Sequence, residues 1–451
     1  MGIHSKLPTS DRDLRLYLFL GLANWSIFLD HIPDDVVNLI TARNYGFSGA
    51  ADLFILISGY IAFAHYGRMM LERGSLVGAT RIFKRAGQLY AAYVVLFVTY
   101  IAFIGYIARQ YSTTDIIGEF NVAGLIDHPI RILARGLLLQ ARPLNLDVLQ
   151  LYTLLTVLLA PVLWLMLRLP NLTMIGSIAL YVAARQFEWN LSSFPEGDWY
   201  FNPFCWQLLF VFGGWLALGG ARRFAWALKS RFILDLGLVY LAFALVMTLA
   251  RRFPELGQLF PASLLDSFDA NGKVNLAPYR LLHFIVVVFV VTRFVAKDAA
   301  WLKWPVFNPL IKCGEESLAV FCVGVFLSFI GHFELTLSSG SVTAQVLVSV
   351  TGIAIMALVA YYISWSRQQD AWKTVAANEA PRSAEHGIGQ PQRQDRHVGD
   401  DGKHDQKQDQ ERQDTADHLA DRRGRNGREH EQIEPDRRVN QPDLHVVGED
   451  N

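Results

Sequence analysis

The sequence has few cysteines and no excess of charge of either sign, and both features exclude classes of protein. Its three cysteines, Cys205, Cys313 and Cys322, lie in or beside apolar runs without CxxC spacing, so they indicate neither a disulfide framework nor a cysteine metal site. The 41 basic and 41 acidic residues balance, so the chain lacks the general basic surface of a nucleic-acid-binding protein. We therefore expect no nucleic-acid partner and no bound metal.

Aromatic residues are missing from the end of the chain. Residues 380–451 contain no Phe, Trp or Tyr, while Asp, Arg, Gln and His crowd together there. A segment of this composition buries too little apolar surface to form a core, so we expect a disordered polar tail in the cytoplasm. Its six His are scattered among Asp and Gln, which is more typical of solvated coil than of a metal site. The sequence leaves open whether this tail is functional or a read-through product.

The rest of the chain is strongly apolar. A window of about 19 residues, roughly the length that crosses a bilayer, predicts about ten membrane-spanning helices. They are expected near residues 14–32, 47–66, 86–108, 146–168, 172–187, 203–220, 232–250, 280–296, 309–331 and 343–365. The first run has no small-residue cleavage pattern, so we expect a retained helix rather than a signal peptide. The predicted fold class is therefore an all-α integral membrane protein, a bundle of about ten transmembrane helices.

The orientation of the helices is predicted from the positive-inside rule. Short loops that are rich in Lys and Arg stay in the cytoplasm. Loop 67–85 is the richest in basic residues and is expected inside, and an even number of spans then places both termini in the cytoplasm. Arg251 and Arg252 fall on the outer side, against this rule. Residues 128–140 are expected to form an amphipathic helix on the membrane surface.

Ionisable side chains inside spans cost at least about 2.5–3.5 kcal/mol each, so they are candidate functional residues. Asp30 and His31 lie at the outer end of the first span, and Asp52 lies at a similar depth in the second. Histidine is a natural general base for a hydroxyl nucleophile, and a carboxylate can set its tautomer. Adjacent helix residues point about 100° apart, so the partner of His31 stays open among Asp30, Asp34, Asp35 and Asp52. An interfacial His beside solvated acids fits the same spacing.

A basic cluster, Arg81, Lys84 and Arg85, precedes the third span on the cytoplasmic side. Arg81 and Arg85 share a helix face, which suits the phosphates of a nucleotide-bearing donor such as coenzyme A. The positive-inside rule produces the same pattern without any binding function, and the spacing alone favours that interpretation. Glu316, at the inner end of the ninth span, is expected to approach this face. Gly59, in the second span, is expected to serve close helix packing.

Further polar residues gather near the predicted outer ends of spans four, six and eight. They are Asn145, Asp147, Asn202, Gln207, Arg280 and His283. With the first two spans they predict a polar cavity open to the outer side. Each of them alone is more typical of a hydrogen bond between helices than of catalysis.

Ten short segments together carry a family resemblance. They are FLDHIP at 28–33, RNYGFS at 43–48, ADLF at 51–54, ISGY at 57–60, and residues 81–90, 145–149, 201–204, 206–210, 281–284 and 317–322. Together they resemble the OpgC family of membrane succinyltransferases, which modify osmoregulated periplasmic glucans. The resemblance covers about residues 10–366, the transmembrane domain, and leaves the tail of residues 380–451 unexplained.

The resemblance implies ten spans in a bacterial inner membrane and kinship with the family-3 membrane acyltransferases. It implies transfer of an acyl group, typically succinyl from cytosolic succinyl-CoA, to a sugar hydroxyl across the membrane, with no tightly bound cofactor. His31 matches the outer-end His of the family, and Arg81 with Arg85 matches its cytoplasmic basic motif. The expected partners are membrane lipid, acyl-CoA, a periplasmic glucan or other polysaccharide, and the glucan-synthesis machinery.

The site hypothesis has three parts: catalysis by His31 with Asp30 and Asp52, donor binding by the basic cluster, and substrate binding by the six outer polar residues. A span separates the two ends by about 30 Å, so either the pantetheine arm of coenzyme A reaches inward or an acyl-enzyme relay carries the group. The sequence does not choose between these routes. Two rival functions stay open: an acetyltransferase of another surface polysaccharide, and a glycan exporter or flippase without acyl chemistry.

Overall fold

The computed structural model describes residues 13–33, 35–111, 128–141, 145–194, 196–268, 270–337 and 340–385. The chain divides into two units, residues 1–376 and 377–451, and the helices discussed below belong to the first, apart from the end of α16. Within the described ranges every element is a helix, with two isolated β-bridges besides. The all-α prediction is confirmed. Helix α16 continues to Glu385, inside the predicted tail, and the remainder of that tail lies outside the described residues.

Helices occupy all ten positions at which spans are predicted. They are α1 (Leu14–Asp30), α2 (Ala50–Arg73), α3 (Ser75–Tyr111), α6 (Asp147–Arg168), α7 (Pro170–Gln186), α8 (Pro203–Ala217), α10 (Arg231–Arg252), α13 (Pro278–Phe294), α15 (Ser317–Leu337) and α16 (Val342–Glu385). Among the described residues, α2, α3, α6, α10, α15 and α16 are long and apolar enough to span a membrane, and α8 with the bent segment after it raises the number from 6 to 7. Helices α1, α7 and α13 have 17 residues each. These helices support a membrane protein, but the predicted count of ten spans is not confirmed.

Two of the predicted boundaries are wrong. The predicted loop 67–85 is helical except at Gly74, where a φ of 93° turns the chain from α2 into α3; glycine adopts this conformation without steric cost. The predicted ninth span, 309–331, is two helices, α14 (Asn308–Glu315) and α15, which part at the buried Glu316. The predicted surface helix at 128–140 is present as α5 (Pro129–Leu137).

Local sequence signals begin several of these helices. The side chain of Asp13 accepts a hydrogen bond from the backbone N–H of Arg15 at the start of α1, and Asn202 does the same for Phe204 at the start of α8. Such caps satisfy N–H groups that have no partner within the helix. Proline occupies the first turn of α7, α8 and α13, where its missing N–H removes no helical hydrogen bond.

Glycines bring the two central helices together. A Cβ atom on Gly59 of α2 would overlap the carbonyl of Phe210 on α8, and a Cβ on Gly213 of α8 would overlap the carbonyl of Leu56 on α2. The backbones therefore approach closely, in agreement with the packing role predicted for Gly59. Helices α1, α3 and α6 pack against α2 around this pair.

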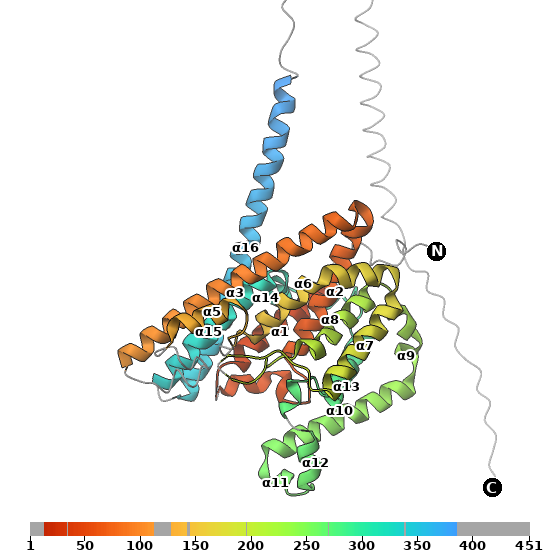
Figure 1. Ribbon diagram of the computed structural model, residues 1–451, viewed down its shortest axis with the longest axis vertical. Helices are drawn as coiled ribbons and strands as arrows, with labels where there is room; N and C mark the ends of the chain where they lie inside the picture. The colour runs from red at the N-terminus through yellow and green to blue at the C-terminus, as the bar shows by residue number, and fades with distance from the viewer. Residues whose placement is uncertain are drawn as a thin grey trace, which may run out of the picture. The chain divides into compact units, whose positions relative to one another are not determined.

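Residues 231–294, which we call the flanking module, are less buried than the central helices. Only 17% of the apolar stretch of α10 is buried, compared with 61% for α2. Two short helices, α11 (Pro254–Gly257) and α12 (Ala262–Ser267), lie at the end of α10 (Figure 1), and α13 packs beside it. The ring of Phe47, from the connection between α1 and α2, lies 5.2 Å from that of Phe268 and 5.1 Å from that of Tyr279. This connection therefore links the flanking module to the central helices.

Candidate functional site

A cavity of about 740 Å³ opens where the end of α1, the α1–α2 connection, the start of α6 and the flanking module meet. We call it the His31 cavity. Among the polar residues singled out from the sequence, those that line it are Asp30, His31, Asn145, Asp147 and Arg280. Further polar or charged lining residues, which sequence reasoning did not assign to the site, include Arg43, Glu196, Tyr200, Arg251, Arg252 and Lys273. The structure thus gathers both groups from segments that are far apart in the sequence.

His31 directly follows the last residue of α1 and lines the cavity. Its backbone N–H donates to the carbonyl of Phe28, which holds the residue at the end of the helix. The Nδ1 atom of its ring is buried and makes no hydrogen bond of ordinary geometry with the described residues. Leaving a buried polar atom unpaired is costly, and such atoms in a cavity wall are typical of a site that binds a ligand.

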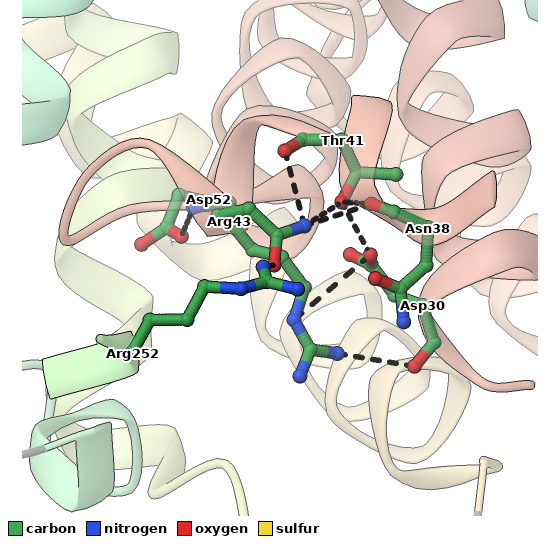
Figure 2. A network of polar contacts seen from close by, with 8 residues as sticks. Asp30, Asn38, Thr41, Arg43, Asp52 and Arg252 are labelled. Carbon is green, nitrogen blue, oxygen red and sulfur yellow. Dashed lines mark hydrogen bonds and ion pairs between the residues drawn. The ribbon is translucent and has the colours of Figure 1, made fainter. Parts of the chain in front are cut away.

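Asp30 anchors a network on the rim of the cavity (Figure 2). Its carboxylate accepts a hydrogen bond from Thr41 Oγ1 at 2.7 Å and lies 4.0 Å from Nε of Arg43. The amide of Asn44 donates to Thr41 Oγ1 at 3.1 Å and accepts from Arg252, also at 3.1 Å. The network therefore ties the end of α1 to the end of α10. Asp30 holds the connection that shapes the cavity, and its proposed catalytic role stays a prediction.

The other acids considered as partners of His31 lie elsewhere. Asp35 Oδ2 accepts a hydrogen bond from Ser349 Oγ of α16 at 2.6 Å. Asp34 lies outside the described residues. The structure thus gives Asp35 a role in joining the α1–α2 connection to α16.

Asp52 and Arg280 form a buried ion pair, of which Arg280 lines the cavity. Nε of Arg280 donates to Asp52 Oδ1 at 3.0 Å, and one amino group of the same guanidinium donates to Oδ2. The other amino group donates to the carbonyl of Phe47 at 2.8 Å. Asp52 also accepts from the backbone N–H of Gly49 at 2.9 Å, which caps α2. Fork-to-carboxylate pairing fixes both side chains, so Asp52 is engaged with Arg280; the catalytic role of Asp52 stays a prediction.

Lys273 is a cation of the cavity that the sequence did not single out. It ends the short helix η5 (Ala270–Lys273), and its carbonyl accepts a hydrogen bond from Trp206 Nε1 at 2.9 Å. Its Nζ lies 5.1 Å from the ring centroid of Tyr200 and 5.0 Å from that of Phe201, which is within cation–π range. Burial and the neighbouring charge of Arg280 lower the pKa of Lys273 from 10.5 to about 8. Lys273 is therefore mostly protonated at neutral pH.

Asn145 and Asp147 line the cavity at the start of α6. Asn145 is buried with a φ of 74°, and its side-chain amide makes no hydrogen bond of ordinary geometry with the described residues. A positive φ in a residue other than glycine costs conformational energy and often marks functional sites. Both residues are therefore well placed to bind a substrate.

Three other residues predicted to bind substrate make contacts typical of helix packing and do not line the cavity. Asn202 caps α8. Nε2 of Gln207 donates to the carbonyl of Ser177 at 2.9 Å, which joins α8 to α7. Nδ1 of His283 lies 2.8 Å from Oγ of Ser48. The structure does not bring these three to the cavity, and their binding roles stay predictions.

A second cavity, of about 430 Å³, contains Arg85 and is called the Arg85 cavity. Arg81 and Lys84 are exposed and do not line it, so the structure separates Arg85 from the rest of the predicted basic cluster. Glu316 lines the same cavity, as expected, and lies 2.8 Å from the guanidinium of Arg367. Arg367 lies on α16, beyond the last predicted span, where no motif pointed to it.

The two cavities follow the same three helices, α1, α2 and α6. On α6, Val148 lines the His31 cavity and Tyr152 lines the Arg85 cavity; on α2, the corresponding residues are Ala51 and Phe54. At a rise of about 1.5 Å per residue, the lining residues of the two cavities are separated by only about 5–6 Å along α2 and α6. Along α1 the corresponding separation is about 10 Å. The rings of Phe54 and Tyr152 meet edge to face at this boundary, 5.6 Å between centroids.

The family model for the OpgC protein matches residues 12–368. The chain belongs to the OpgC family. The resemblance drawn from the ten short segments is thereby confirmed. Comparison with curated proteins gives no match, and neither does comparison with solved structures. Membership of the OpgC family supports an acyltransferase-like role on glucans.

The segments that carried the OpgC resemblance lie at both cavities. Residues 28–33 and 43–48 contribute to the His31 cavity, and residues 317–322 contribute to the Arg85 cavity. In the part of this OpgC chain that the structure describes, no group of three or more His, Cys, Asp or Glu is arranged to hold a metal ion. The groups that line the His31 cavity are a histidine, nearby amides and acids, and cations.

Proposed function

We propose that this OpgC protein moves an acyl group, succinyl in particular, from cytosolic acyl-CoA to a hydroxyl of a periplasmic glucan. The observation that carries the proposal is the alignment of the His31 cavity with the Arg85 cavity along α1, α2 and α6. His31 in the first cavity suits a hydroxyl acceptor, and Arg85 in the second suits a phosphate-bearing donor. By the positive-inside rule, the Arg85 cavity opens to the cytoplasm.

In this mechanism His31 is the general base. Its ring removes the proton from a glucan hydroxyl, and the oxygen attacks the carbonyl carbon of the thioester. The bond from carbon to sulfur then breaks, and the leaving thiolate receives the proton from His31. The buried side-chain amide of Asn145, on the wall of the same cavity, is available to hold the sugar.

The spacing of the cavities favours direct transfer over an acyl-enzyme relay. Steps of about 5–10 Å along the lining helices replace most of the roughly 30 Å that a full span would impose. A pantetheine arm held in the Arg85 cavity then needs to pass only the boundary at Phe54 and Tyr152. Trapping of an acyl group on His31 would support the relay instead.

The test is the charge of periplasmic glucans from a strain that lacks this gene. The strain is complemented with the wild type, with His31→Ala, or with His128→Ala, a control that alters an exposed His outside both cavities. We expect the wild type and the control to restore anionic glucans and His31→Ala to leave them neutral. Equal restoration by all three proteins would show that His31 is not the base.

The two rival functions give different results in the same strains. An acetyltransferase would add mass to the glucan without adding negative charge. An exporter or flippase would leave modification intact in His31→Ala cells while reducing the amount of glucan outside the inner membrane. Mass and charge measured on separated cytoplasmic and periplasmic glucans therefore distinguish all three.

A further inference from the structure

The succinyl group itself has a free carboxylate, which a partly buried binding site must satisfy with a cation or hydrogen-bond donors. This inference rests on the proposed function. Arg280 lines the cavity, but its guanidinium is engaged by Asp52 and by the carbonyl of Phe47. Replacing these bonds with a substrate carboxylate would leave Asp52 buried without its partner, which is costly.

The arginines of the rim are also engaged. Arg43 lies beside Asp30 and donates to its carbonyl at 3.1 Å. Arg251 donates to the carbonyl of Phe268 at 2.5 Å, and Arg252 donates to Asn44. Each of these contacts holds part of the cavity wall in place.

Lys273 is held by aromatic rings, whereas the contacts named for these arginines are with oxygen atoms. Among the described residues, its ammonium contacts the faces of Tyr200 and Phe201 rather than a carboxylate. The aromatic rings hold the charge in position but do not neutralise it. Lys273 lines the same cavity as His31, so a carboxylate that reaches it belongs to a molecule within the reach of the proposed base.

We propose that Lys273, held between Tyr200 and Phe201, binds the free carboxylate of a dicarboxylic acyl group and thereby makes the protein select succinyl over neutral acyl donors. Lys273 is thus a specificity-determining residue rather than a base. An ammonium–carboxylate contact in this half-buried position discriminates against an acyl group that lacks the carboxylate, because the cation is then left without a partner.

The experiment uses the full-length protein in lipid vesicles, unmodified glucan, and either succinyl-CoA or acetyl-CoA. We expect Lys273→Met to lower the rate of succinyl transfer by about tenfold to a hundredfold, with acetyl transfer unchanged or faster. Lys273→Arg should restore the preference for succinyl, since it keeps the charge. Lys303→Met, an exposed lysine outside both cavities, is the matched control and should behave as the wild type.

Two results would overturn the inference. If Lys273→Met keeps the succinyl preference of the wild type, Lys273 does not recognise the carboxylate of the acyl group. If it lowers both rates equally, Lys273 supports the fold or binds the acceptor, because the acceptor is the same in both reactions. Absence of acyl transfer by the wild type with either donor would instead refute the proposed function, and the inference would fall with it.

Discussion

The carboxylate of Asp52 is bound on both oxygens by Arg280, so two residues that the sequence assigned to different tasks form one buried unit. Asp52 is fully buried and Arg280 nearly so. The pair joins α2 to α13, and through α13 it joins the central helices to the flanking module. Arg280 of this pair also lines the His31 cavity.

Replacing one residue of this pair should destabilise the protein more than replacing both. Asp52→Leu or Arg280→Met alone leaves one buried charge and is expected to cost about 3–5 kcal/mol. The double variant should recover a large part of that loss, since neither charge remains. Thermal unfolding in detergent measures the comparison. Additive losses in the double variant would mean that the two side chains act independently.

Arg85 should matter for the donor, and Arg81 should not. Only Arg85 lines the second cavity, although both residues lie on α3 one turn apart. Arg85→Gln is expected to raise the KM for acyl-CoA about tenfold or more, the usual effect of losing a charge-assisted hydrogen bond. Arg81→Gln is the control and should leave KM unchanged. An equal effect of both variants would favour a surface patch over a site in the cavity.

Filling the Arg85 cavity should block the donor arm. Ala92 lines this cavity, whereas Ala91, its neighbour on α3, is exposed. Ala92→Phe is expected to abolish most of the acyl transfer, while Ala91→Phe, which adds the same volume outside, should retain it. The measurement is the initial rate of acyl transfer from succinyl-CoA by the two variants. Normal activity of Ala92→Phe would exclude this cavity as the route of the donor.

The pH dependence of succinyl transfer should report the charge of Lys273. Its pKa is lowered to about 8 by burial and by Arg280 and Arg43, with Asp52 and Asp30 acting in the opposite direction. Lys273 is protonated below that pH and neutral above it. Succinyl transfer is therefore expected to fall as the pH rises through about 8, and acetyl transfer should not follow the same curve.

The arginine variant supplies the control for this pH profile. Arginine stays protonated throughout the range, so Lys273→Arg should lose the decline of succinyl transfer above pH 8. His31, on the wall of the same cavity, is unchanged in this variant. A decline that persists in Lys273→Arg would belong to another group.

The sequence predicted the helices well because each is a long apolar run, and the bilayer makes such runs unambiguous. It also predicted that Asp30, His31, Asn145 and Asp147 would share a cavity, since charged and polar groups at similar depth gather away from lipid. Helix lengths near the limit of a span could not be fixed to within a turn, so the count of ten spans stays a prediction beside the 6 or 7 described helices that are long and apolar enough to span.

Several of the residues that were missed lie in connections, where no periodic pattern places a side chain. Lys273 sits in a short helical turn between α12 and α13, and only the folded chain brings it to His31. Arg251 and Arg252 did carry a signal: their predicted position on the outer side goes against the positive-inside rule, and both line the cavity. The pairing of Asp52 with Arg280 was not foreseen, because sequence separation hides contacts between distant helices.

The flanking module supplies Lys273, Arg251 and Arg252 to one cavity, whereas the other cavity is built without it. Under the proposed function, acceptor and acyl preference can therefore diverge through changes confined to one stretch of chain, with the proposed coenzyme A site left intact. A chimera is made by exchanging residues 231–294 between two relatives. It should form the same acylated product as the relative that supplied residues 231–294. Relatives could then differ in how they modify a glycan without any change in the central helices.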